Sequence, residues 1–531
     1  MSAMILIAGT VMILCILLYR FSNWIGVPML LAFILLGMLF GTDGIVKIPF
    51  DDFSVAEQIC SLALVGIMFY GGFGTKWSEA RPIATKAVLL STVGVLITGL
   101  LVAGFCHFLL KMDWLFGLLI GAVVSSTDAA SVFSILRSKK LNLKYRTASL
   151  LEMESGSNDP FAYLFTLVIL SVMNGSANVF STVGMIVAQI LFGVFFGGLA
   201  AFLAYRIMVR FRFSEGFDAL FVLAVALLAY SAADLTGGNG YLSVYLFGVL
   251  LGNKSLNNKK TLVHFFDGIT GLMQIVIFFL LGLLSFPSQL PALVLPALAV
   301  AIFLTMVARP IAVGLLLTPF RCPLNMQALV AWSGLRGAAS VVFTIYAAVH
   351  SSFVGEELFH LVLFIVLFSI LIQGSLISPI AKKLCMIDGK EDVLKTFNDY
   401  SEEIPVQFIQ FTLDQRHPWI GRPLSRIVLP PDTVMIQILR QDETIVPNGS
   451  TVLQSGDHCV LGAHATEFFG EMHFSELTLG SDHSWVGKQL YQIKPDHGSL
   501  IILIQRGNSV IIPSGRTRLR QGDLLVVNRI I

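Results

Sequence analysis

Charged residues are scarce in this 531-residue sequence. Asp, Glu, Lys and Arg make up only 13% of it, whereas hydrophobic residues make up 55%. Soluble domains are about 25% charged, so a chain that is soluble throughout is excluded. Cysteine is also rare: the six cysteines are scattered without a C-x-x-C pair, which argues against disulfides and metal ligation. The composition predicts a polytopic α-helical membrane protein with a soluble part.

Other absences narrow the function. No repeated filter-like loop is present, which disfavours a channel with a regulatory cap, although saturable proton-coupled flux would be needed to separate the two classes. No protease motif accompanies Asp128 and Asp159, which disfavours an intramembrane hydrolase. We therefore expect a protein that is not an enzyme, has no cofactor and binds no nucleic acid, and whose contacts include membrane lipids.

Apolar segments separated by short polar loops fill residues 1–385. A membrane span needs about 20 apolar residues, and on this basis we predict thirteen spans. The first lacks a basic n-region and a cleavage site, so it is expected to be a retained helix. The thirteen ranges are 3–20, 27–42, 56–72, 86–109, 114–137, 147–172, 178–209, 216–234, 240–253, 263–285, 291–317, 325–350 and 356–384.

Basic residues predict the orientation. With the N-terminus outside, the inner loops and flanks hold most of the Lys and Arg residues of this half, whereas the outer loops hold only Lys47 and Lys111. Lys and Arg concentrate in cytoplasmic loops. We therefore expect an outside N-terminus in a bacterial cell membrane and a cytoplasmic C-terminal domain.

Two predicted spans contain polar breaks. The fifth reads "GAVVSSTDAASVF", and the twelfth reads "AWSGLRGAASVVF" with Gly334 and Gly337 on either side of Arg336. The breaks hold equivalent places if spans 1–6 and 8–13 are two inverted six-helix repeats joined by span 7. Paired discontinuous helices in inverted repeats, with a site near the midplane, are typical of transporters.

The sixth span contains "MESGSNDPFAY". Ser155 and Asp159 are four residues apart and share a helix face, and Pro160 leaves the Gly156 carbonyl without its usual N–H partner. A hydroxyl, a carboxylate and a carbonyl near one point suit a hard cation, which takes oxygen ligands. Intramembrane charges are costly unless paired, so Glu154 needs a counter-charge, and Arg336 is the expected partner.

The segments "STDAASVFSIL", "EMESGSNDPFA" and "GLRGAASVVF" resemble the signature segments of the NhaP-type monovalent cation:proton antiporters, over about residues 1–385. The subgroup most similar is the potassium/proton antiporters of the cell-volume-regulation kind. The resemblance implies crossing broken helices, a homodimer, and a residue, Asp159, that alternates between proton and monovalent cation. Ser155, Thr127 and Asp128 would complete the cation site, and Asn158 would stabilise the crossing helices.

The same resemblance implies exchange of a cation, most readily potassium, for protons, with sodium as the alternative. Because Asn158 is neutral beside Asp159, we expect one-for-one, electroneutral exchange. One position departs from the pattern: relatives often carry an acidic residue in the third span, where this sequence reads "MFYGGFG" with Tyr70. That difference leaves the selectivity between potassium and sodium open.

The composition after Cys385 is that of an ordinary globular protein. A polar linker at 386–405 precedes two units, at 406–466 and 472–531, whose matching residues differ by 66 in number, among them Trp419 and Trp485. Such an ungapped register indicates an internal repeat. The units resemble TrkA-C domains, small α/β units that bind ligands and in some relatives bind cyclic dinucleotides. No G-x-G-x-x-G stretch precedes them. Dimer stabilisation alone is the other interpretation.

Overall fold

The chain divides into two compact units, residues 1–402 and 403–531. The computed structural model describes residues 2–25, 29–128, 132, 143–175, 178–211, 216–256, 259–351, 353–387, 406–415, 417–430, 433–441, 443–464, 473–480, 483–493, 499–506, 509–511 and 513–529. The end of the fifth predicted span, nearly all of the predicted linker and the boundary between the two predicted small units lie outside these residues.

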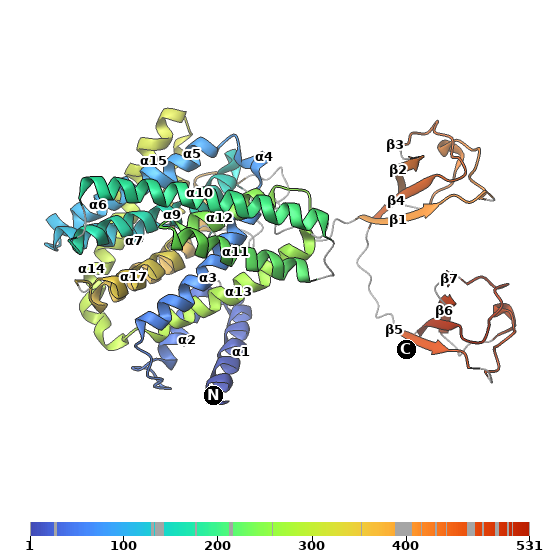
Figure 1. Cartoon of the computed structure of the whole chain (residues 1–531), viewed down its shortest axis with the longest axis horizontal. Coiled ribbons are helices and arrows are strands. Elements are labelled where there is room, and N and C mark those ends of the chain that lie inside the picture. Colours follow the sequence, from blue (N-terminus) through green and yellow to red (C-terminus); the bar gives the residue numbers. More distant parts are fainter. Residues whose placement is uncertain are drawn as a thin grey trace. The chain divides into compact units, whose positions relative to one another are not determined.

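The first unit is helical (Figure 1). Its helices are α1 (Ser2–Ile25), α2 (Met29–Phe40), α3 (Phe53–Gly74), α4 (Trp77–Ala80), α5 (Ala84–Leu89), α6 (Val95–Phe108), α7 (Trp114–Ser125), α9 (Thr147–Met173), α10 (Val179–Arg210), α11 (Phe217–Leu235), α12 (Gly240–Gly252), α13 (Lys259–Leu283), α14 (Leu290–Phe303), α15 (Arg309–Leu317), α16 (Leu324–Trp332), α17 (Ala338–His350), α18 (Glu356–Phe368) and α19 (Ser375–Lys383). Single π-helical turns join α5 to α6, α14 to α15 and α18 to α19.

Length and composition support a membrane location. Among the described residues, seven helices or joined helices are long and apolar enough to cross a bilayer, and five shorter apolar helices accompany them. Helix α9 is not among these apolar helices, because it contains the polar stretch of the predicted sixth span. Each predicted span overlaps at least one of these helices. The count of thirteen spans and the inverted-repeat relation stay predictions.

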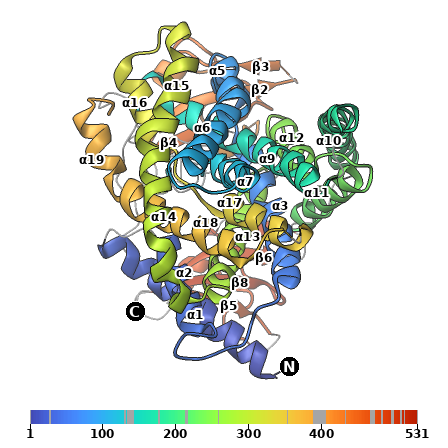
Figure 2. The ribbon, with the colours of Figure 1, turned by 90° about the vertical axis from the view of Figure 1, so that its left-hand side faces the viewer.

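Helix packing separates two groups (Figure 2). In one group α3, α12 and α13 pack together, α2 packs on α13, and α10 and α11 pack on α12. In the other, α6 packs on α7, and α7 packs on α9, while α14 and α17 pack on α18. The groups meet where α9 and α17 contact α3 and α12. Helix α9 is therefore central to the unit, and most of its residues from Leu150 to Leu164 are buried.

The second unit contains two small antiparallel sheets. The first has the order β1-β4-β2-β3, with strands β1 (Val406–Thr412), β2 (Thr433–Arg440), β3 (Glu443–Ile445) and β4 (His458–His464). The second has the order β5-β8-β6-β7, with strands β5 (His473–Thr478), β6 (Ser499–Arg506), β7 (Ser509–Ile511) and β8 (Leu524–Arg529). The same register irregularity recurs at Met435/Gln437 and Ile501/Leu503, 66 residues apart, as the sequence repeat predicts.

The helical part of the α/β prediction for these units is not met in the part of the chain that is described. Residues 406–464 and 473–529, apart from the gaps given above, form strands and two 3-10 turns, at Leu424–Arg426 and Leu490–Gln492. Glycines with positive φ, Gly421 (74°) and Gly487 (82°), precede the two turns. A left-handed glycine interrupts a helix, so the segment "WIGRPLSRI" forms a turn against its sheet.

Candidate ion-binding site

The two predicted helix breaks meet inside the first unit. Helix α7 ends at Ser125, and residues 126–128 have no helical structure. Helix α16 ends at Trp332, and α17 begins at Ala338 after an irregular segment. The Asp128 N–H donates a 2.7 Å hydrogen bond to the Leu335 carbonyl, which joins one break to the other. Helix α7 thus ends inside its predicted span, and an irregular segment separates α16 from α17, as the polar breaks in the sequence predict.

Arg336 satisfies the free end of α7. The last carbonyls of a helix have no partner within the helix. The buried Arg336 guanidinium donates from Nη1 to the Ser125 and Ser126 carbonyls, at 3.0 and 2.7 Å. A cation at a helix C-terminus also opposes the negative end of the helix dipole. Arg336, which lies in the irregular segment before α17, therefore stabilises the end of α7.

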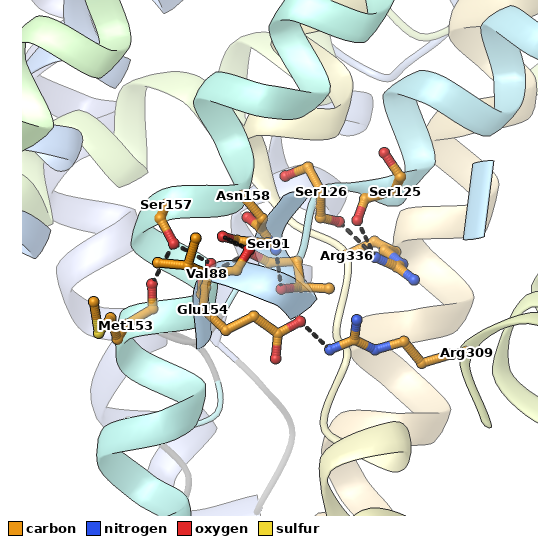
Figure 3. A network of polar contacts seen from close by, with 12 residues as sticks. Val88, Ser91, Ser125, Ser126, Met153, Glu154, Ser157, Asn158, Arg309 and Arg336 are labelled. Carbon is orange, nitrogen blue, oxygen red and sulfur yellow. Dashed lines mark hydrogen bonds and ion pairs between the residues drawn. The ribbon is translucent and has the colours of Figure 1, made fainter. Parts of the chain in front are cut away.

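The predicted pairing of Glu154 with Arg336 is wrong. Glu154, which is 1% exposed, forms its ion pair with Arg309 at the start of α15 (Figure 3). Arg336 is occupied by the α7 carbonyls, which would otherwise be buried without donors. Sequence position indicated which charges lie within the spans, but the choice of partner depends on which helix faces α9.

Asp159 faces the broken end of α7. Asp159 is 6% exposed, and its carboxylate accepts a hydrogen bond from the Ser126 hydroxyl. The Ser155 hydroxyl donates to the Thr127 carbonyl at 2.7 Å, and the Asn158 amide donates to the Thr127 hydroxyl. Figure 3 shows Asn158 of α9 beside this segment. The polar stretch of α9 is thus bound to residues 126 and 127 at several points.

Asp128 completes the predicted set. It is partly buried, and its carboxylate is close enough to act on the charge of Asp159. Gly337 packs against the Asp128 side chain so closely that a Cβ atom on Gly337 would overlap it. The structure therefore brings Asp159, Asp128, Ser155 and Thr127 together. Pro160 lies within continuous helix α9, and its own carbonyl accepts a 2.9 Å hydrogen bond from Asn239.

Two features of the region were missed by sequence reasoning. Ser126, which was not singled out from its polar neighbours, is the side chain that touches Asp159. Tyr70, where relatives often carry an acid, donates a 3.1 Å hydrogen bond to the Asp267 carboxylate of α13. Asp267 lies in the predicted tenth span but was not recognised as an intramembrane acid. The sequence around Asp267 gives no indication that its partner lies in the predicted third span.

The arrangement offers oxygen atoms from several chemical groups. Two carboxylates, three hydroxyls and the backbone at residues 126–128 lie around one point of a buried helix crossing. Hard cations prefer such oxygen ligands. Oxygen-rich sites beside discontinuous helices are typical of membrane carriers of small cations.

Comparison with known proteins places the chain more narrowly. The family described as sodium/hydrogen exchanger, transmembrane, matches residues 10–383, and the TrkA-C domain matches residues 408–461 and 474–527. The chain belongs to the sodium/hydrogen exchanger family and carries two TrkA-C domains.

Individual relatives agree with this assignment. The K(+)/H(+) antiporter NhaP2 of Shewanella sp. (strain MR-4) is 34% identical over 87% of this chain and 81% of its own length. The K(+)/H(+) antiporter NhaP of Alkalimonas amylolytica is 35% identical over 85% of this chain and 80% of its own length. The sodium proton antiporter MjNhaP1 of Methanocaldococcus jannaschii shares the fold, with a TM-score of 0.64 at 24% identity over 72% of this chain and 99% of that structure.

Proposed function

We propose that this protein exchanges potassium for protons across the cell membrane, with Asp159 as the residue that binds each in turn. The observation that carries the proposal is the buried Asp159 carboxylate at the contact of α9 with the broken end of α7, where Ser126 donates to it. Burying an unpaired carboxylate costs free energy unless it binds a proton or a cation. The two relatives described above are K(+)/H(+) antiporters, which supports potassium as the cation.

The residues around Asp159 take distinct roles in this proposal. Ser155, Thr127 and Asp128 supply further oxygen atoms to the cation, while Asn158 holds α9 against the break in α7. Glu154 and Arg309 neutralise each other and stay out of the site. Because one carboxylate cannot hold a proton and a cation together, each excludes the other. Asn158 adds no charge, and the resulting exchange is one-for-one and electroneutral.

The choice of cation is tested in everted membrane vesicles. Potassium, sodium, lithium or rubidium is added to vesicles with an established proton gradient, and a pH-sensitive dye reports proton movement. Dequenching that is largest with potassium and rubidium supports the proposal. Dequenching that is largest with sodium would assign the chain to sodium/proton exchange instead, as in the name of the probable Na(+)/H(+) antiporter 2 of Methanocaldococcus jannaschii, which is 26% identical.

The TrkA-C domains serve regulation in this proposal. The distribution of Lys and Arg supports a cytoplasmic location for these domains, with the N-terminus outside. There a cyclic dinucleotide or another small ligand can reach them. The active form of the protein in this proposal is a homodimer. Removal of residues 403–531 leaves basal exchange intact but removes its response to cytoplasmic ligands. Complete loss of exchange in a truncated protein that still inserts in the membrane would contradict a purely regulatory role.

A further inference from the structure

One face of α9 carries a regular series of functional groups. Glu152, Gly156, Asp159 and Tyr163 are spaced by four, three and four residues. Side chains at these spacings lie above one another on a helix. This face, called the strip below, therefore presents a carboxylate, a position without a side chain (the gap), a second carboxylate and a phenol. Gly156 is the gap, one turn from each carboxylate.

Tyr245 of α12 fills the gap. A Cβ atom on Gly156 would lie 2.5 Å from Cε2 of the Tyr245 ring and 3.1 Å from its hydroxyl oxygen. Tyr245 is 5% exposed, its hydroxyl is hydrogen-bonded to Thr75 at the end of α3, and Glu152 and Asp159 both act on it electrostatically. The ring therefore covers the strip between the two carboxylates.

A second aromatic contact lies on the other side of Asp159. Tyr163 packs its ring against Tyr241 of α12 with centroids 5.1 Å apart, and against Phe343 and Tyr346 of α17 at 5.5 and 5.4 Å. Tyr163 and Tyr241 are both buried. This contact covers the strip beyond Asp159, in the direction away from Glu152.

The two contacts share one helix. Tyr241 and Tyr245 are four residues apart in α12 and lie on the same face, which is turned toward α9. Helix α12 packs chiefly on α3, α10 and α11, the helices of the first packed group, whereas α9 and the broken helices form the site. One helix of the first group thus touches the strip on each side of Asp159.

We propose that Tyr245 and Tyr241 are the two barriers of the exchange cycle: Tyr245 closes the route between Glu152 and Asp159, and Tyr241 with Tyr163 closes the route to the opposite face. This inference rests on the proposed function of Asp159. A carrier stays coupled only while at least one barrier is shut. Gly156 is required because any side chain there would occupy the position of the Tyr245 ring.

The test uses the full-length protein in liposomes, with rubidium flux and dye-reported proton flux measured on the same preparation. In Tyr245→Ala the first barrier is missing, so both routes are open whenever the second barrier opens. We expect rubidium flux to exceed proton flux several-fold. Tyr245→Phe keeps the ring that fills the gap at Gly156, so it stays coupled.

Gly156→Ala supplies a reciprocal test. The added methyl group overlaps the Tyr245 ring, so exchange slows several-fold, and adding Tyr245→Ala restores flux because the space is vacated. Gly104→Ala on α6, where a Cβ atom meets nothing within 4 Å, is the matched control and exchanges at the wild-type rate. A structural defect alone would make the two changes additive.

The outcomes distinguish a failure of the proposed Tyr245 barrier from a failure of the proposed function of Asp159. Full coupling in Tyr245→Ala, or no recovery in the double variant, overturns the assignment of Tyr245 even if Asp159→Asn is inactive. Exchange that persists in Asp159→Asn overturns the proposed function itself, whatever the tyrosine variants do. Size-exclusion profiles of each variant in detergent identify any protein that has failed to fold.

Discussion

At the scale of single residues, the buried charged side chains Glu154, Arg336 and Asp159 each contact a polar or charged group. Arg309 neutralises Glu154, Arg336 binds the carbonyls at the end of α7, and Ser126 donates to Asp159. The neighbours of Asp159 are instead a neutral hydroxyl, that of Ser126, and another carboxylate, that of Asp128. That difference is the reason we propose a structural role for Glu154 and assign the proton and the cation to Asp159.

The Glu154–Arg309 pair gives a prediction about stability. Removing one member of a buried ion pair leaves the other uncompensated and costs about 3–5 kcal/mol. We expect Glu154→Gln and Arg309→Gln each to lower the thermal unfolding temperature in detergent, and the double variant to lose much less than the sum. A larger non-additivity of the stability losses between Glu154→Gln and Arg336→Gln would instead support the Glu154–Arg336 pair expected from the sequence.

The failure to predict that pair has a physical origin. Intramembrane charges, proline and polar breaks are properties of a single segment, so the sequence indicates Asp159, Ser155 and the breaks at 126–128 and 333–337. The partner of Glu154 and the role of Ser126 depend on which helices face each other. Arg309 and Arg336 both lie well inside predicted spans, and nothing local distinguishes Arg309, which faces α9, from Arg336, which lies beside the end of α7.

At the scale of elements, the site depends on two helices that stop. The end of α7 and the start of α17 are held together by the Asp128–Leu335 backbone hydrogen bond and by Arg336. Gly337, just before α17, has extended backbone that any residue adopts, so it is required for space rather than for conformation. The absent side chain lets Asp128 approach α17.

Substitution of Gly337 tests that close approach. In Gly337→Ala the new methyl group overlaps the Asp128 side chain and displaces it. We expect exchange to fall by roughly 100-fold, the effect of misplacing a reacting group by about 1 Å. The protein should still insert and elute normally. The rate is measured by dye dequenching, with Gly104→Ala as the control, and a wild-type rate in Gly337→Ala would show that Asp128 needs no such room.

At the scale of the whole molecule, two units of different chemistry share one chain. In each sheet of the second unit a buried aspartate binds an arginine through two hydrogen bonds: Asp457 with Arg440 at 2.7 and 2.8 Å, and Asp523 with Arg506 at 2.7 Å twice. The hydrogen-bonded guanidinium holds the pKa of each carboxyl below its usual value. The repeat in the sequence predicted this equivalence, because both pairs differ by 66 in number.

These pairs predict how the second unit responds to acid. Because the folded pKa of Asp457 is lowered, its contribution to stability is present above an unfolded pKa of about 3.9 and is lost as pH falls through the folded value. In a fragment of residues 403–531, Asp457→Asn should therefore lower the free energy of unfolding at pH 7 by about 1–3 kcal/mol, and the loss should shrink below pH 4. Asp414→Asn, at an exposed position, is the control. A loss that is independent of pH would exclude the linkage.

The central claim is that one carboxylate, Asp159, carries both the proton and the cation. It is tested most directly by comparing wild type, Asp159→Asn and the exposed control Asp51→Asn in liposomes, with proton movement recorded after a potassium pulse at several imposed membrane potentials. The proposal predicts exchange that is independent of potential in wild type and Asp51→Asn, and none in Asp159→Asn. Potassium-driven proton movement that persists in Asp159→Asn would contradict it.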